Sequence, residues 1–175
     1  ETNNQAIRQM LAIQKHRGPD DSGIVAINTQ NKTFENVTID NDTSFQTAND
    51  VVLGFNRLSI LDLSPMGHQP MVSPDQKVVL IMNGEIYNAF DFKAELEQKG
   101  HTFKSTSDTE IVLHLYLEYG MEKMIRLLNG MFALAIYDLN LDTLFLARDR
   151  FGIKPLYLLK EEGRIAFASE MKSFK

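Results

Sequence analysis

Four apolar segments of strand length near the end of the sequence most constrain its fold. They cover residues 131–137, 143–148, 156–159 and 164–168. Apolar residues fill nearly every position of these segments instead of alternating, which is typical of strands that are covered on both faces. Short turns at residues 139–142 and 161–163 separate some of the segments. The sequence therefore predicts an antiparallel meander with other layers packed on each side.

Helical patterns and further strands fill the rest of the sequence. The predicted helices cover residues 2–15, 88–100, 107–120 and 122–129. The third of these begins at a capping box, Ser107-Asp108-Thr109-Glu110. The additional predicted strands cover residues 23–27, 51–55 and 77–82, and the polar residues 28–50 are expected to form turns or a loose hairpin. Because helices and strands do not alternate regularly, we expect one α+β domain over residues 1–175.

Length and charge exclude several classes of protein. A chain of 175 residues is in the range of one compact domain, about 100–200 residues. The net charge of −5 argues against broad electrostatic binding to nucleic acid or to anionic membranes. No apolar stretch approaches the ~20 residues of a membrane helix, and the first residues have no signal-peptide core. We expect a cytoplasmic protein without nucleic-acid or membrane partners.

Cysteine is absent from the sequence. Within these residues its absence excludes disulfides, Cys-ligated metals and a cysteine nucleophile. The four histidines form no pair at metal-ligand spacing, so no metal site is predicted. The usual nucleotide-binding and hydrolase motifs are also missing.

Three polar positions could together bind one small ligand. The Asn83 amide and the Gly84 N–H could donate to a developing oxyanion, Arg57 could clamp a carboxylate, and Asp108 could receive an ammonium group. Each also has a simpler interpretation when taken alone. Asn-Gly is a strong turn signal, a strand-end arginine often pairs with a neighbouring acid, and an aspartate is common in the first turn of a helix. Composition does not establish that these groups converge.

A series of motifs nevertheless resembles one known family. In order they are His16-Arg17-Gly18-Pro19-Asp20, Arg57-Leu58-Ser59-Ile60-Leu61-Asp62, Gly67-His68-Gln69-Pro70-Met71, Asn83-Gly84-Glu85-Ile86-Tyr87-Asn88, Ser107-Asp108-Thr109-Glu110, Asn129-Gly130-Met131-Phe132-Ala133, Arg148-Asp149-Arg150-Phe151-Gly152-Ile153-Lys154-Pro155-Leu156-Tyr157 and Ala168-Ser169-Glu170-Met171-Lys172. The series resembles the class II glutamine amidotransferase domain of glutamine-hydrolysing asparagine synthetases, and it runs through nearly the whole chain.

The resemblance implies a fold and an activity. The fold would be the four-layer α/β/β/α sandwich of the N-terminal-nucleophile hydrolases. The domain would hydrolyse glutamine to glutamate and ammonia without a cofactor. The ammonia would pass to a synthetase domain in the same polypeptide, which uses ATP and Mg²⁺ to amidate aspartate. Related enzymes are often dimers, so a homodimer is one candidate assembly.

The resemblance also implies roles for individual residues. Arg57 would hold the α-carboxylate of glutamine, and Glu85 with Asp108 would receive its α-amino group. Leu58 and Ile60 would line the pocket, partly through their backbone groups.

The catalytic residues implied by the resemblance are incomplete in this sequence. Asn83 and Gly84 would form the oxyanion hole, but the family's nucleophile is an N-terminal cysteine whose own α-amine acts as the base. Two explanations are open. In the one we favour, the chain is a piece lacking the first strand with its nucleophile and lacking the synthetase domain, and as such inactive. In the other, it is a non-catalytic pseudo-amidotransferase that serves as a binding or structural module.

Overall fold

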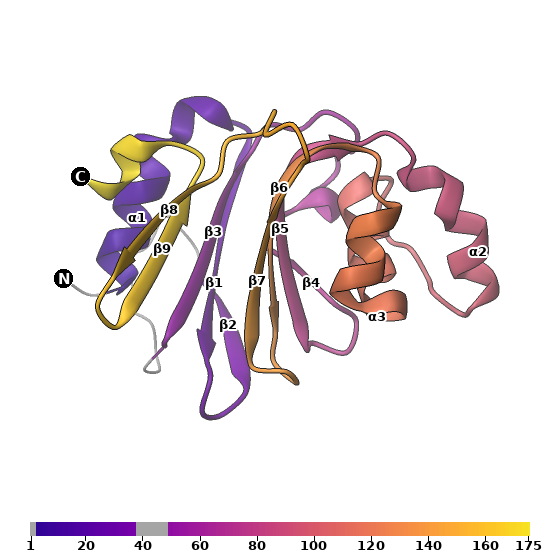
Figure 1. Cartoon of the computed structure of the whole chain (residues 1–175), viewed down its shortest axis with the longest axis horizontal. Coiled ribbons are helices and arrows are strands. Elements are labelled where there is room, and N and C mark those ends of the chain that lie inside the picture. Colours follow the sequence, from indigo (N-terminus) through magenta and orange to yellow (C-terminus); the bar gives the residue numbers. More distant parts are fainter. Residues whose placement is uncertain (1–2, 38–48) are drawn as a thin grey trace.

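The computed structural model describes residues 3–37 and 49–175, and these form four layers (Figure 1). From one side to the other, the layers are helix α1 (Asn3–Ile13), a three-stranded sheet, a four-stranded sheet, and the helices α2 (Lys93–Gln98) and α3 (Asp108–Leu127). The predicted α+β class and the α/β/β/α order are therefore confirmed. None of the helices described is long and apolar enough to cross a membrane.

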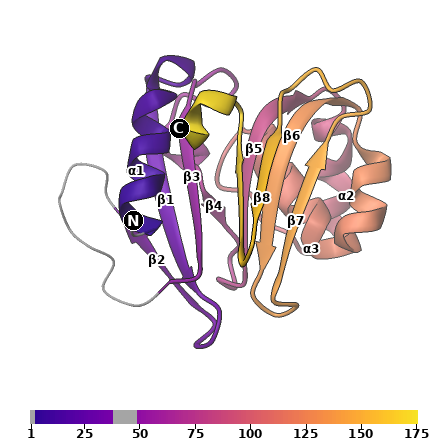
Figure 2. The same ribbon diagram turned by 60° about the vertical axis from the view of Figure 1, so that its left-hand side comes forward.

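The first sheet is antiparallel and has the strand order β2-β1-β3. Its strands are β1 (Asp21–Asn28), β2 (Thr33–Val37) and β3 (Val51–Arg57). Strands β1 and β2 form a hairpin, and its turn and second strand lie in the polar residues 28–50, where turns or a loose hairpin are predicted. The rest of that region, residues 38–48, lies outside the described residues. Figure 2 shows α1 lying against this sheet, where it contacts β3.

The second sheet is also antiparallel, with the order β4-β5-β6-β7. Its strands are β4 (Met71–Val72), β5 (Val78–Ile86), β6 (Gly130–Asp138) and β7 (Thr143–Arg148). Strand β5 runs on to Ile86, past the predicted end at residue 82, because residues 83–86 pair with the start of β6. Asn83-Gly84 therefore lies inside a strand, and the turn interpretation of this dipeptide is wrong.

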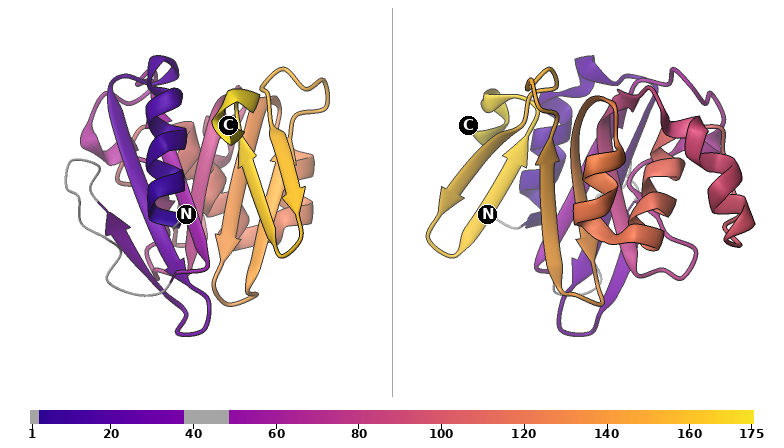
Figure 3. Two further views of the ribbon diagram at one scale, coloured as in Figure 1. Left: turned by 90° about the vertical axis from the view of Figure 1, so that its left-hand side faces the viewer. Right: turned by 45° about the vertical axis from the view of Figure 1, so that its right-hand side comes forward.

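Strands β8 (Tyr157–Glu161) and β9 (Arg164–Ala168) form a separate two-stranded sheet. The predicted single meander is wrong at this point, since β7 pairs with β6 and not with β8. The connection after β7 instead carries the chain to the α1 side of the second sheet (Figures 1 and 3). Strand β8 is largely exposed and β9 is exposed in its first half, although most of the residues of the hairpin are apolar.

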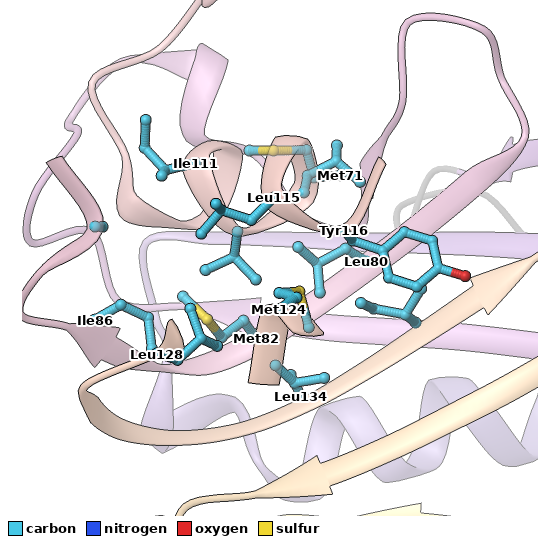
Figure 4. Close-up of a cluster of buried hydrophobic side chains, with 14 of the residues drawn as sticks. Met71, Leu80, Met82, Ile86, Ile111, Leu115, Tyr116, Met124, Leu128 and Leu134 are labelled. Carbon is cyan, nitrogen blue, oxygen red and sulfur yellow. The ribbon is translucent and has the colours of Figure 1, made fainter. Parts of the chain in front are cut away.

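Two apolar clusters hold the layers together. The cluster between the two sheets contains Val25, Ile27, Leu53, Val79, Tyr137 and Leu139. The larger cluster lies between the second sheet and α3 (Figure 4), and its labelled members are Met71, Leu80, Met82, Ile86, Ile111, Leu115, Tyr116, Met124, Leu128 and Leu134. The second sheet is thus buried on both faces, as its continuous apolar strands predict.

The helices follow the predicted pattern with local differences. The helix predicted over residues 88–100 is split into a 3-10 turn, η3 (Ala89–Phe92), and α2. Helix α3 is interrupted at Gly120, whose φ of 71° is non-helical and suits glycine, so the two predicted helices meet there.

The Ser107 side chain accepts the N–H of Glu110 at 3.3 Å. The Glu110 carboxylate instead accepts the N–H groups of Lys104 and Ser105, so only half of the predicted capping box forms. Three further 3-10 turns are η1 (Lys15–Arg17), η2 (Pro65–Gly67) and η4 (Met171–Phe174).

Candidate active site

A cavity of about 1230 Å³ lies among α1, β3, β5, β6 and β9. All seven residues singled out from the sequence line it: Arg57, Leu58, Ile60, Asn83, Gly84, Glu85 and Asp108. They come from the end of β3 and the loop after it, the second half of β5, and the start of α3. The fold therefore brings these distant motifs together around one space. That space is larger than the roughly 300–1000 Å³ of a typical small-molecule site.

Arg57 is the last residue of β3, and only 7% of it is exposed. One guanidinium nitrogen, Nη1, donates to the Ser64 carbonyl at 3.1 Å, and the other, Nη2, donates to the Asp62 carbonyl. Gly67 packs directly against the guanidinium, since a Cβ at Gly67 would lie 2.0 Å from Nη2. Arg57 forms no ion pair with an acidic side chain within residues 3–37 and 49–175. These contacts fix the guanidinium and leave part of its set of five N–H donors for a ligand.

Asn83 and Glu85 project from β5 toward the first sheet. Side chains alternate along a strand, and Val79 on the same face belongs to the cluster between the sheets. Both residues are half-buried and line the cavity. Their backbone groups pair with β6, opposite Ala133 and Met131. The backbone that carries these two side chains is therefore fixed by a continuous ladder of hydrogen bonds and does not form a flexible turn.

The N–H of Gly84 points away from β6. In β5 the odd-numbered residues bond to β6, and the bond from the Tyr87 N–H to the Asn129 carbonyl continues this pattern. The even-numbered residues face the other edge, where the Met82 N–H donates to Gln69 Oε1 and the Ile86 N–H donates to Asp108 Oδ2. Gly84 lies between these two, and no acceptor for its N–H is found in the part of the chain that the structure describes. The alternation of the strand thus leaves one backbone donor available beside Asn83.

Asp108 is the first residue of α3, and only 5% of it is exposed. Its carboxylate accepts the Ile86 N–H at 2.8 Å, which joins the start of the helix to β5. Burial, and to a lesser extent the negative charge of Glu85, raises the pKa of Asp108 above its usual range. An ammonium group bound near both carboxylates would relieve their repulsion, so this end of the cavity favours a cation.

Leu58 and Ile60 lie in the loop after β3 and are 56% and 70% exposed. Both line the cavity. They contribute apolar surface at its rim, whereas the polar groups named above lie deeper. Within residues 3–37 and 49–175, no group of three or more His, Cys, Asp or Glu side chains is arranged to hold a metal ion.

Sequence reasoning missed two residues that support the site. The Gln69 side chain accepts the Met82 N–H at 2.7 Å and donates to the Met82 carbonyl at 3.3 Å, so it extends the pairing of β5 past the short strand β4. Asp149 accepts the N–H of Phe132 at 3.3 Å, and Phe132 lies opposite Gly84. Both residues stand within the motifs quoted above, but nothing local in the sequence indicates what they bind.

Two strand edges face the cavity. All residues of β3 line it, and so do all residues of β9. Strand β3 pairs on one side with β1, and β9 pairs on one side with β8. Among the described residues, the other edge of each strand has no partner strand. The space between these edges accounts for the large volume of the cavity and for the exposure of the β8–β9 hairpin.

Comparison with known proteins agrees with this fold. The four-layer fold is that of the N-terminal-nucleophile hydrolases. Glutamine phosphoribosylpyrophosphate amidotransferase from Bacillus subtilis is similar to this chain with a TM-score of 0.80 and 25% sequence identity, over 99% of this chain and 41% of that structure. Residues 26–175 match the family model described as a glutamine amidotransferase domain. The chain belongs to this family.

The similar curated proteins are named as glutamine-hydrolysing asparagine synthetases. The chain is 46% identical over 132 residues to asparagine synthetase [glutamine-hydrolyzing] 2 of Bacillus subtilis, and this match covers 75% of the chain and 17% of the relative. It is 40% identical over 169 residues to asparagine synthetase [glutamine-hydrolyzing] 1 of the same organism, covering 97% of the chain and 23% of the relative. A putative asparagine synthetase of Methanocaldococcus jannaschii is 37% identical, over 94% of the chain and 29% of the relative. The chain thus spans less than a third of the length of these relatives.

Proposed function

We propose that this chain is the glutaminase domain of a glutamine-dependent asparagine synthetase, which hydrolyses glutamine to glutamate and ammonia. One observation carries the proposal: a guanidinium, two carboxylates and a pair of N–H donors line the same cavity. These are the three kinds of group needed to hold an α-amino acid and to activate its side-chain carbonyl. The family of the chain and its curated relatives support the same substrate.

Glutamine would bind with its two ends fixed separately. Its α-carboxylate would accept hydrogen bonds from Arg57, whose fork of donors suits a carboxylate. Its α-ammonium group would lie near the carboxyl groups of Glu85 and Asp108, whose mutual repulsion it would relieve. The carboxamide oxygen would then face Asn83 and the free N–H of Gly84. Both donors stabilise negative charge that develops on this oxygen during attack, which is the largest single contribution in many acyl transfers.

The nucleophile would come from a strand that this sequence does not contain. We place this strand between the free edges of β3 and β9. It would pair with both strands there, and so join the three-stranded sheet to the β8–β9 hairpin beside the cavity. A cysteine at its N-terminus would attack the carboxamide carbon, and its own α-amine would take the thiol proton and deliver it to the departing ammonia. Water would then hydrolyse the thioester and release glutamate. The oxyanion formed in each step would be held by Asn83 and Gly84.

The complete protein would use the ammonia elsewhere. We propose a synthetase domain in the same polypeptide, because the relatives extend well beyond the region that this chain matches. ATP and Mg²⁺ would act in that domain to amidate aspartate, and the glutaminase domain would need no cofactor. The proposed location is the cytoplasm, and a homodimer is the proposed assembly.

The test is the release of glutamate from L-glutamine by the full-length polypeptide. Replacement Asn83→Ala should lower kcat by about 100-fold to 1000-fold, the usual effect of removing one oxyanion donor. The KM for glutamine should change little, because Asn83 acts mainly on the transition state. Asn140→Ala, in the exposed turn after β6, is the matched control and should leave kcat unchanged.

The same protein separates the proposed function from its alternative. Glutamine that binds in calorimetry without any hydrolysis would indicate a non-catalytic binding domain. Hydrolysis that Asn83→Ala leaves unchanged would refute the assignment of the oxyanion hole.

A further inference from the structure

Asp62 lies in the loop after β3 and is 5% exposed. One carboxylate oxygen, Oδ1, accepts the N–H of Ser64 at 2.7 Å. The other, Oδ2, accepts the N–H of Thr106 at 2.7 Å, across 44 positions of the sequence. These hydrogen bonds, first of all that from Ser64, lower the pKa of Asp62 to about 2. The side chain is therefore a buried carboxylate with a backbone donor on each oxygen.

The two partners of Asp62 connect it to both charged positions of the site, Arg57 and Asp108. The loop that Asp62 closes through Ser64 supplies both carbonyl acceptors of the Arg57 guanidinium, from Asp62 itself and from Ser64. Thr106 lies two residues before Asp108, and Ser107 between them caps α3. One carboxylate thus connects the loop that holds the guanidinium to the segment that begins the helix with the buried acid.

We propose that Asp62 is a positioning residue that sets the distance between Arg57 and Asp108, and thereby selects ligands that carry both a carboxylate and an ammonium group at this spacing. This inference rests on the proposed function, since it assumes that Arg57 and Asp108 hold the two charged groups of glutamine. Both carboxylate oxygens of Asp62 already accept backbone N–H groups, so Asp62 would not bind the ligand directly. Its effect passes through the loop 58–64 on one side and through residues 106–108 on the other.

The chemistry of the contacts requires a carboxylate at this position. Both partners of Asp62 are N–H donors, so two acceptor oxygens are needed. An asparagine has nearly the same shape but one oxygen, and its NH₂ group would face one of the two donors. Asp62→Asn therefore breaks one of the two connections without removing volume from the protein.

The experiment compares three ligands in calorimetric titrations of the full-length protein in which the proposed nucleophilic cysteine is replaced by alanine, so that glutamine binds without being hydrolysed. L-Glutamine carries both charged groups, 4-carbamoylbutanoate lacks the α-amine, and 4-aminobutanamide lacks the α-carboxylate. Asp62→Asn should weaken L-glutamine binding about tenfold, which corresponds to ~1.4 kcal/mol. Binding of either analogue should change less than about twofold, because a ligand that carries only one of the two charged groups does not sense the distance between Arg57 and Asp108.

Asp138→Asn is the matched control. Asp138 is also a buried aspartate that accepts backbone N–H groups, those of Asn140 and Leu141, but it lies at the other end of β6, about 20 Å from the site. Both variants should lower the unfolding temperature, and only Asp62→Asn should change the preference for L-glutamine over the analogues. If Asp62→Asn does not fold, Asp62→Ser, which keeps one short acceptor, is measured in its place.

The outcomes distinguish a failure of the proposed function from a failure of the positioning role of Asp62. If the protein that keeps Asp62 does not bind L-glutamine, the proposed function fails. If it does bind L-glutamine but Asp62→Asn weakens all three ligands equally or none of them, the proposed function stands and the positioning role of Asp62 is wrong.

Discussion

Gly84 connects the stability of the second sheet to the chemistry of the site, and Gly84→Ala tests this connection. A Cβ at this position would lie 2.3 Å from the Met131 carbonyl oxygen and 2.7 Å from the Phe132 Cα. Both distances are far below the roughly 3.5–4.0 Å of a favourable contact. Because both atoms belong to the backbone of the paired strand β6, no side-chain rotation can relieve the clash. Strands β5 and β6 would have to separate where the Gly84 N–H is presented to the cavity.

The expected cost can be estimated from two opposing effects. Overpacking of a rigid interior costs about 1–3 kcal/mol, and the upper end applies because backbone atoms are in the way. Replacing a strand glycine by alanine recovers about 0.5–1 kcal/mol of conformational entropy. Gly84→Ala should therefore lower the free energy of unfolding by about 2 kcal/mol, or the melting temperature by about 4–8 °C.

Urea unfolding followed by far-UV circular dichroism measures this effect, since the chain contains no tryptophan for fluorescence. Gly54→Ala in β3 is the control. There a Cβ would meet Ile7 Cδ1 at 2.9 Å and Leu11 Cδ1 at 3.1 Å. These are the ends of side chains that can move, so the loss should stay below about 1 kcal/mol. Equal stability of the two variants, or a Gly84→Ala protein within about 0.5 kcal/mol of wild type, would refute the argument.

Three further predictions concern residues outside the candidate site. Tyr116→Phe should cost about 1.5–3 kcal/mol in urea unfolding, since the buried Tyr116 hydroxyl donates to the Asp138 carboxylate at 2.7 Å; no loss would show that this bond contributes nothing. Ser107→Ala should cost about 1 kcal/mol in the same assay, because it removes the N-cap of α3, and an unchanged midpoint would contradict the assigned cap. Burial, and then the neighbouring His101, lower the pKa of His114 below its usual 6.5. The unfolded chain then binds more protons than the folded one below about pH 6.5, so this contribution to stability is complete above that pH and is lost as the pH falls. His114→Gln should reduce the difference in unfolding free energy between about pH 7 and about pH 5, and an undiminished difference would exclude His114 as its source.

Much of the fold could be predicted because its signals are local. The continuous apolar strands indicated a sheet covered on both faces, and Gly120 marked the break in α3. The end of β5 could not be predicted in this way. Asn83-Gly84 is a turn signal by itself, and it lies in a strand because residues 130–133 pair with it from far along the sequence. Likewise, β8 does not pair with β7, because the connection after Arg148 leads away from the second sheet. No local pattern in the sequence indicates the direction of this connection.

In the candidate site too, local sequence signals could be interpreted, whereas contacts between distant segments could not be predicted. The sequence indicated which residue types could bind an α-amino acid, and all of them line one cavity. It did not indicate that the Arg57 guanidinium is fixed by two backbone carbonyls, or that Asp62 and Gln69 hold the surrounding backbone. These contacts join segments that are distant in the sequence. They form only when the chain folds, so no local pattern in the sequence indicates them.

The most direct test of the central claim is the release of ammonia from L-glutamine by this chain extended at its N-terminus with its own upstream residues. The proposed function predicts that the extension begins with cysteine, fills the space between β3 and β9, and yields one ammonia for each glutamate formed. The cysteine→alanine variant of the extension should bind glutamine and release no ammonia. An extended protein that begins with cysteine and binds glutamine but does not hydrolyse it would contradict the account.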